Sequence, residues 1–223
     1  MNSLYNDNSL NFWKMIMIPA FKSTFQMVIA TTILGTILGS IIAIVLLITN
    51  KEGIHPNKYI YRIVSFVVNI VRSFPFVILM VFLLPLTKTL VGTSIGVQAA
   101  IVPMTISASA FIAKLIENSM QEVDKSLIEA MKSFGIKDYH LITKVILSEA
   151  TPSIISGIIL ATISILGFTA IAGTMGAGGI GSAAITYGYQ SFNYQVMYFI
   201  AFILVVFVEG IQTFGNYIYR KMK

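Results

Sequence analysis

The sequence predicts an all-α integral membrane protein with five transmembrane helices, and three observations lead to this prediction. Hydrophobic residues make up 56% of the 223 residues, whereas charged residues make up 11%, less than half the share in a typical soluble domain. The mean hydropathy is +0.83. Charged residues are also absent from several stretches of about 20 residues or more, the length that crosses the hydrocarbon core of a bilayer.

Apolar stretches with at most one charged residue place the five spans. They are residues 23–50, 63–87, 89–113 and two stretches within 150–208, separated by a glycine- and tyrosine-rich segment at 173–194. Arg72 is the only charged residue in the second span. Residues 1–22 lack a basic region followed by a long apolar core, so we expect a short interfacial segment and not a cleaved signal peptide. The membrane domain is then expected to cover residues 23–219.

The distribution of lysine and arginine predicts that the N-terminus lies outside the cell. An odd number of spans puts the termini on opposite faces, and cytoplasmic loops carry an excess of Lys and Arg. In this orientation the outer segments hold only Lys14, Lys22 and Lys88. The cytoplasmic segments hold Lys51, Lys58, Arg62, Lys114, Lys125, Lys132, Lys137, Lys144, Arg220, Lys221 and Lys223. The loop 114–149, between spans three and four, is therefore expected in the cytoplasm.

Two features of the spans have more than one interpretation. Small residues recur every four positions in the first span, which allows helix backbones to approach closely, either inside the protein or in a dimer contact. They are Thr31, Gly35, Gly39 and Ala43. Arg72 and Glu209 are charges within apolar stretches, and they either reach toward the cytoplasmic interface or serve the function directly.

Composition and motifs exclude several classes of site. The chain has no cysteine, and its two histidines, His55 and His140, are too few for a metal centre or a catalytic triad. We expect both as ordinary loop residues, with His55-Pro56-Asn57 forming the turn between the first two spans. The basic residues form no patch interleaved with aromatic residues, so no nucleic acid is expected as a partner.

A glycine pattern in the fourth loop resembles a nucleotide site but lacks its context. Gly176, Gly178 and Gly181 form G-x-G-x-x-G, but a long apolar run precedes them in place of a strand. The next acidic residue is Glu209, too far along the chain to hold a ribose. No G-x-x-x-x-G-K-[ST] phosphate loop occurs, so the chain is not expected to hydrolyse ATP. Scarce intramembrane carboxylates also disfavour coupling to an ion gradient.

The loop 114–149 carries signals for two short helices. Ser126 and Glu129 form S-x-x-E, so we expect a capping box, and Gly135 is expected to end the first helix in a left-handed conformation. Asp138 is expected to cap a second helix with apolar residues on one side, namely Leu141, Ile142, Val145 and Ile146. The amphipathic first helix either docks on another subunit or packs on the protein's own helix ends.

The same loop carries a family resemblance. Glu129-Ala130-Met131, three residues, Gly135, nine residues and Val145-Ile146-Leu147 resemble the E-A-A-x3-G-x9-I-x-L-P motif of bacterial ATP-binding-cassette importer permeases. Ser148 replaces the proline, so the backbone break is expected to move to Pro152. The chain is similar to methionine importer permeases in particular through five further motifs in family order: RSFPF (72–76), VGTSIG (91–96), QAAIVP (98–103), AGTMGAGGIG (172–181) and YGYQSFNYQVM (187–197).

The resemblance implies partners and roles. It implies a multi-pass protein of the bacterial cytoplasmic (inner) membrane that imports D- and L-methionine by alternating access. The implied partners are a second copy of the chain, two cytoplasmic ATPase subunits that bind the ATP and magnesium, and an outer methionine-binding lipoprotein. This chain itself is expected to hold no cofactor, metal or catalytic residue.

The expected site residues fall into three groups. Coupling to the ATPase is expected at Glu129, Ala130, Met131 and Gly135. The translocation path is expected along Gly167, Phe168, Ile171 and Thr174, with Phe168 and Ile171 as its narrow apolar gate. An outer glycine loop is expected to permit tight turns at Gly176, Gly178, Gly179 and Gly181. The alternatives are an ion-gradient-driven carrier or channel for small amino acids, and a membrane scaffold with no transport role.

Overall fold

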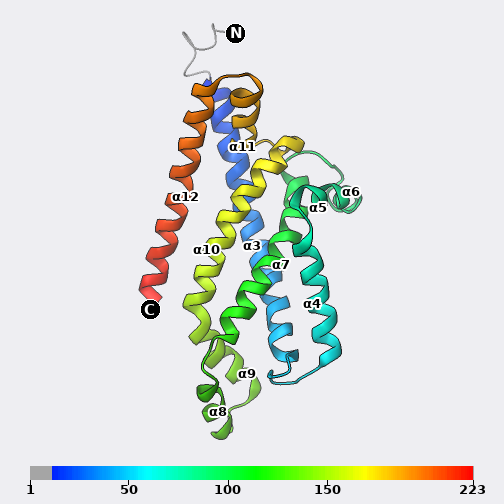
Figure 1. The fold of residues 1–223 in the computed structure, drawn as a ribbon, viewed down its shortest axis with the longest axis vertical. Helices are drawn as coiled ribbons and strands as arrows, with labels where there is room; N and C mark the ends of the chain where they lie inside the picture. The colour runs from blue at the N-terminus through cyan, green and yellow to red at the C-terminus, as the bar shows by residue number, and fades with distance from the viewer. Residues whose placement is uncertain (1–11, 223) are drawn as a thin grey trace. The chain divides into compact units, whose positions relative to one another are not determined.

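In the computed structural model, which describes residues 12–222, all regular structure in that range is helical (Figure 1). The elements are η1 (Trp13–Met17), α3 (Ile18–Thr49), α4 (Lys58–Ser73), α5 (Phe76–Phe82), α6 (Leu84–Val91), α7 (Val97–Gln121), α8 (Lys125–Ser133), α9 (Asp138–His140), η2 (Leu141–Ile146), α10 (Leu147–Ala172), η3 (Gly173–Ala177), α11 (Ile180–Ala183), η4 (Ala184–Gln190) and α12 (Tyr194–Met222). The η elements are π-helical turns. Part of the predicted interfacial segment, residues 1–11, lies outside the described range.

Residues 12–222 contain four helical stretches that are long and apolar enough to cross a membrane. They are Trp13–Thr49, Val97–Gln121, Asp138–Ala177 and Tyr194–Met222. The pair α4 and α5 makes a fifth candidate if it is counted as one broken span. The predicted class, an all-helical membrane protein, is confirmed, with four or five spans.

The second and third spans differ from the prediction. The second is not continuous to Thr87, because Phe74 and Pro75 have extended backbones and separate α4 from α5. A residue before proline is driven out of the helical region, which explains the break. The third span begins at Val97 and not at Thr89, because Gly92 (φ +83°) ends α6 in a left-handed conformation.

The described residues group into two compact units, and each long helix contributes to both. Unit 1 comprises residues up to 33, 75–105 and 162–211, and unit 2 comprises 34–74, 106–161 and residues from 212 onward. The core of unit 1 contains Met17, Ala20, Ile180, Ala183, Val196 and Ile200. The Thr24 hydroxyl accepts a hydrogen bond from the backbone N–H of Ile180 (2.9 Å), which fixes the start of α11 on α3.

In unit 2, the small residues of α3 lie against α7. A Cβ atom added to Gly35 would stand 3.0 Å from the Cβ of Ala108, and one added to Gly39 would stand 3.0 Å from Ile112 and from the Ser109 carbonyl. Ala43 is fully buried. The two helices approach too closely for larger side chains at Gly35 and Gly39, so at these positions the small residues serve packing within the chain.

Candidate functional site

The N-cap of helix α8 lies two residues before the predicted cap, Ser126. This N-cap is Asp124, whose Oδ1 accepts hydrogen bonds from the backbone N–H and the hydroxyl of Ser126, both at 2.8 Å. The hydrogen bond from the Ser126 hydroxyl, and to a lesser extent the one from its backbone N–H, lowers the pKa of Asp124 below its ordinary value. The S-x-x-E prediction is therefore wrong in position. An ionised carboxylate is the stronger acceptor at a helix N-terminus, and it takes the role assigned to Ser126.

The end of α8 is as predicted. Gly135 has φ +73°, its N–H donates to the carbonyl of Lys132 (2.9 Å), and the N–H of Ile136 donates to that of Met131 (3.4 Å). These two bonds form a Schellman motif, which satisfies carbonyls at the helix end and requires a left-handed residue. A Cβ added to Gly135 would meet no atom within 4 Å. The constraint on Gly135 within the chain is therefore its backbone conformation and not space.

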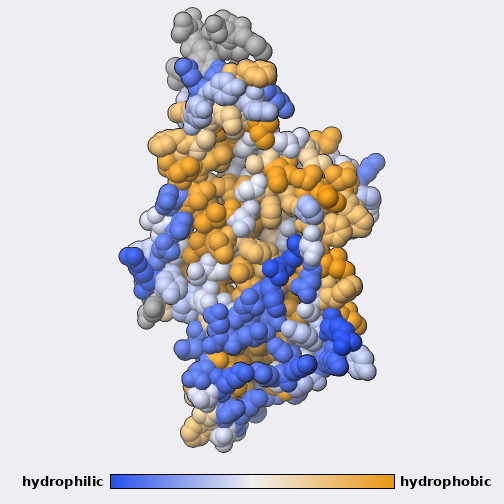
Figure 2. All heavy atoms as spheres, in the orientation of Figure 1, coloured by the Kyte–Doolittle hydropathy of each residue, from blue (hydrophilic) through white to orange (hydrophobic). Residues whose placement is uncertain are grey.

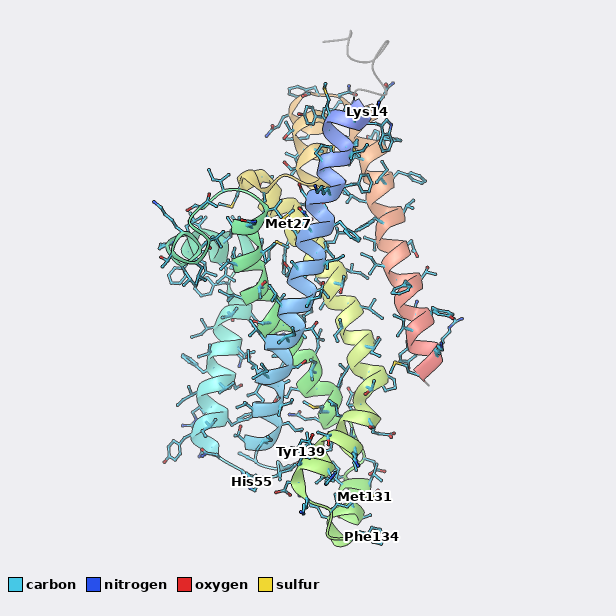
Figure 3. All side chains as sticks on the ribbon, turned by 180° about the vertical axis from the view of Figure 1, so that it is seen from behind. Lys14, Met27, His55, Met131, Phe134 and Tyr139 are labelled. Carbon is cyan, nitrogen blue, oxygen red and sulfur yellow. The ribbon has the colours of Figure 1, made fainter. Side chains whose placement is uncertain are left out.

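Helix α8 is open to an external partner. None of its residues is buried. Glu129 and Ala130 are exposed, Met131 is half-buried, and Phe134 just beyond the helix is 82% exposed. Hydrophilic residues gather over the part of unit 2 that contains α8 and α9 (Figure 2), and Phe134 lies at the tip of this segment, near Met131 (Figure 3). Because an apolar ring stands exposed amid polar residues, the face is not fully covered by the chain itself.

The segment after α8 differs from two expectations. Asp138 is the first residue of α9 and not its cap, and its carboxylate pairs with His55 Nε2 (3.0 Å). Of the predicted apolar face, Leu141 and Ile146 are fully buried. The helix does not break at Pro152, which lies inside α10. The irregularity is instead the π-helical turn η2, whose wider hydrogen bonding accommodates an extra residue.

The residues predicted for the path share one side of α10 and its extension in unit 1. Gly167 and Thr174 are exposed, and Phe168 and Ile171 are half-buried. Positions 167, 171 and 174 follow helical spacing, so they lie on one face. The ring of Phe168 stacks on Phe76 of α5, with ring centroids 4.5 Å apart. An incompletely covered face next to an aromatic stack is compatible with the lining of a path.

The glycines after α10 permit turns and close packing. Gly176, Gly178 and Gly179 have positive φ angles of +98°, +71° and +106°. Gly181 is helical, but a Cβ there would stand 2.3 Å from the Cβ of Ala170. Side chains at these positions would be strained or would collide, which accounts for the motif without any nucleotide.

Sequence reasoning missed a buried charged cluster in unit 2. Glu117 of α7 is 1% exposed, although the prediction assigned Lys114 onward to a polar loop. Its Oε2 accepts from Lys114 Nζ (2.8 Å), and its Oε1 accepts from the Tyr61 hydroxyl (3.1 Å) and from Gln121 Nε2 (3.0 Å). The i, i+3 and i, i+4 spacing of Lys114, Glu117 and Gln121 is the sequence signal that marks one helix face. The cluster links α4 to the C-terminal part of α7, shortly before α8.

We expect Glu117→Ala to destabilise the protein by about 3 kcal/mol, because it leaves the Lys114 charge and two polar groups without their acceptor. Thermal unfolding of the purified protein in detergent measures this loss. Glu209→Ala is the matched control, since Glu209 also lies in an apolar helix but is exposed. Equal unfolding midpoints for the two variants would show that the cluster does not stabilise the helix pair.

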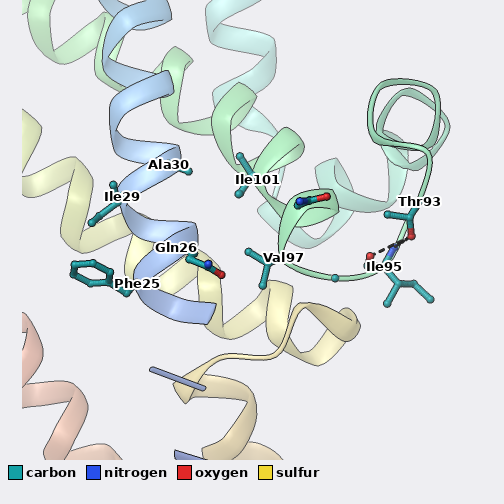
Figure 4. A pocket seen from close by; sticks show the side chains of 10 residues that line it. Phe25, Gln26, Ile29, Ala30, Thr93, Ile95, Val97 and Ile101 are labelled. Atoms are coloured by element: carbon teal, nitrogen blue, oxygen red, sulfur yellow. Dashed lines mark hydrogen bonds between the residues drawn. The ribbon is translucent and has the colours of Figure 1, made fainter. Parts of the chain in front are cut away.

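A hollow of about 740 Å³ lies in unit 1 beside the start of α7 (Figure 4). Its wall includes the loop before α7, in which the Thr93 hydroxyl accepts from the N–H of Ile95 (3.2 Å). The lining residues are Phe25, Gln26, Ile29, Ala30, Thr93, Ile95, Gly96, Val97, Gln98 and Ile101. None of the predicted path residues lines it.

Known proteins resemble the chain over most of its length. The family described as "Binding-protein-dependent transport system inner membrane component" matches residues 35–223. The probable D-methionine transport system permease protein MetI of Vibrio cholerae is 39% identical over 207 residues, 93% of this chain and 92% of that protein. The methionine import system permease protein MetP of Bacillus subtilis is 40% identical over 173 residues, 78% of each chain. A chain of the MetNI methionine ABC transporter, solved in inward-facing conformations, has a TM-score of 0.92 and 36% identity, over 97% of this chain and 99% of that one.

Proposed function

The chain belongs to the family of binding-protein-dependent transport system inner membrane components, and from that premise we propose how it works. It is the permease subunit of a methionine ABC importer, a multi-pass protein of the inner membrane, and a separate subunit hydrolyses the ATP. We propose that it carries both enantiomers of methionine by alternating access. The observation that carries the mechanism is the exposed helix α8, ended by Gly135, with the apolar Phe134 at its tip.

We propose that α8 is the coupling helix. Glu129, Ala130 and Met131 would contact a groove of the ATPase, and the Schellman motif at Gly135 would set the angle at which α8 is presented. A short, capped helix with no buried residue keeps its shape without covering its own binding face. The buried Glu117 cluster supports this role, because it gives α8 a fixed base on α7.

We propose that the transporter contains two copies of this chain, two ATPase subunits and an outer methionine-binding lipoprotein. The exposed face of Gly167, Phe168, Ile171 and Thr174 would line the path, with Phe168 and Ile171 as the gate. The stack of Phe168 on Phe76 supports the gate, since it holds one aromatic ring in a defined position. The glycines at 176, 178, 179 and 181 would shape the outer end, where the lipoprotein docks.

We expect Ser133→Cys to be labelled by an impermeant thiol reagent only after cells are opened, because basic residues predict a cytoplasmic loop. The outer control is Ser191→Cys. Both serines are exposed, and both hydroxyls donate to a helix carbonyl, at 3.0 and 2.9 Å, so the substitutions are closely matched. The chain has no native cysteine to interfere. Labelling of Ser133→Cys in intact cells would contradict the proposed orientation.

Vesicles containing the purified chain alone test the ion-driven alternative. A carrier of that kind needs a titratable group that is free to bind and release the ion. Among the described residues, Glu117 is the only buried residue of an ionisable type, and its carboxylate is already paired with Lys114. We therefore expect no methionine uptake under a proton or sodium gradient without the ATPase. Uptake by the chain alone would contradict the proposed function.

A further inference from the structure

The loop between α3 and α4 reaches both ends of the segment that contains α8. We call residues 50–57 the bracket loop. The carboxylate of Glu52 pairs with Lys125 Nζ (2.6 Å), and Lys125 is the first residue of α8. His55 Nε2 lies 3.0 Å from the carboxylate of Asp138, the first residue of α9. Two side chains of one short loop thus contact the segment 125–138, one at the first residue of the candidate coupling helix and one after its end.

The bracket loop is held rigidly on the end of α3. The N–H of Gly53 donates to the carbonyl of Asn50 (2.9 Å), that of His55 to Ile48 (3.0 Å) and that of Asn57 to Thr49 (3.0 Å). A Cβ on Gly53 would stand 2.4 Å from the carbonyl oxygen of Leu47, so only glycine fits there. These bonds satisfy the carbonyls that end α3. The backbone of the loop is therefore fixed relative to the C-terminal end of α3.

The other end of the loop is fixed to α4 in the same way. Asn57 caps α4, with its Oδ1 accepting from the N–H groups of Tyr59 and Ile60, both at 3.1 Å. One turn further along α4, the hydroxyl of Tyr61 donates a hydrogen bond to the buried Glu117 of α7. The bracket loop thus joins α3 to α4, and its Glu52 and His55 side chains contact α8 and α9.

We propose that the bracket loop is a second coupling element, in which Glu52 and His55 are positioning residues that pass the displacement of α8 to α3 and α4. This inference rests on the proposed coupling role of α8. Without the loop, α8 would act on the membrane helices only through its neighbours in sequence, α7 and α10. With the bracket loop in place, a displacement of α8 also moves the N-terminal end of α4.

The exposure of the two pairs argues against a purely stabilising role. The side chains of Glu52 and Lys125 are 71% and 70% exposed, and those of His55 and Asp138 are 74% and 51% exposed. Exposed pairs of this kind add little to folding stability, whereas complementary charges set the register of the surfaces that they join. The hydrogen bond from Lys125, together with its charge, lowers the pKa of Glu52, so the pair stays ionised at neutral pH and is lost only as the pH falls through that lowered pKa.

Charge reversal of the Glu52–Lys125 pair tests the proposal in vesicles that contain the complete transporter. The measured quantity is methionine imported per ATP hydrolysed, normalised to the amount of complex. We expect Glu52→Lys and Lys125→Glu each to lower this ratio by about twofold to fivefold, the range for loss of an exposed ion pair. The double variant Glu52→Lys/Lys125→Glu restores the pair in reverse and is expected to recover the ratio.

Matched control variants carry the same two kinds of charge reversal at residues that are not part of the Glu52–Lys125 pair. Lys51→Glu alters an exposed residue within the bracket loop, beside Glu52, and Glu122→Lys alters an exposed residue shortly before α8. Neither variant is expected to change the ratio. Single variants that couple as well as the wild type, or a double variant no better than the singles, would overturn the bracket proposal. Wild-type vesicles that import no methionine with ATP would instead overturn the proposed function, so the two failures are distinct.

Discussion

Gly135→Asp is expected to abolish methionine uptake while the permease remains folded in the membrane. An aspartate in the left-handed conformation costs about 1 kcal/mol, too little to unfold the chain, and its Cβ atom would meet no atom of the chain within 4 Å. The added carboxylate would instead stand at the end of α8, where the ATPase groove is proposed to fit. We expect a normal membrane level, weaker co-purification with the ATPase and uptake at background.

Gly92→Asp is the matched control for this prediction. Gly92 also ends a helix with positive φ (+83°), and a Cβ there also meets no atom within 4 Å, but it lies at the end of α6. The backbone strain is therefore the same, and uptake should be retained. If Gly135→Asp imports methionine with the ATPase still bound, α8 is not the coupling helix. If Gly135→Asp alone disappears from the membrane, the residue serves folding and not coupling.

Ile171→Asp is expected to block passage at the proposed gate. A carboxylate in a dehydrated apolar constriction costs several kcal/mol, and each 1.4 kcal/mol corresponds to a tenfold change in rate. Ile171 is half-buried, so the substitution is expected to leave the protein assembled with its ATPase. Uptake of labelled methionine at equal membrane level measures the effect.

The volume-conserving variant Ile171→Leu controls for packing at the same position. It keeps an apolar side chain of similar volume, so uptake should stay close to that of the wild type. Unchanged uptake by Ile171→Asp would remove this residue from the gate. Equal losses of uptake in both variants would mean that the shape of the Ile171 side chain matters for uptake, and not its exclusion of water.

The features predicted well from sequence depend on local rules. Long charge-free stretches predict membrane helices because lipid leaves the backbone no other partner. Gly135 is predicted to be left-handed because helices end in that way at glycine. Gly35 and Gly39 are predicted to let helices approach because their spacing puts them on one face. Each of these inferences needs only neighbouring residues.

The features that were missed depend either on a better acceptor nearby or on partners far along the chain. The S-x-x-E pattern identifies a cap only when no better acceptor precedes it, and Asp124 does. Glu117 is buried because Tyr61, far away in sequence, completes its hydrogen bonds. His55 has a partner in Asp138 for the same kind of reason.

Uptake of labelled methionine into vesicles that contain the permease, its ATPase and the methionine-binding protein measures whether the chain works as the permease of an ATP-driven methionine importer. We expect uptake that requires ATP, stops when the ATPase is omitted and is competed by unlabelled methionine but not by unrelated amino acids. Uptake that continues without ATP, or ATP hydrolysis by the complete complex that moves no methionine, would contradict it.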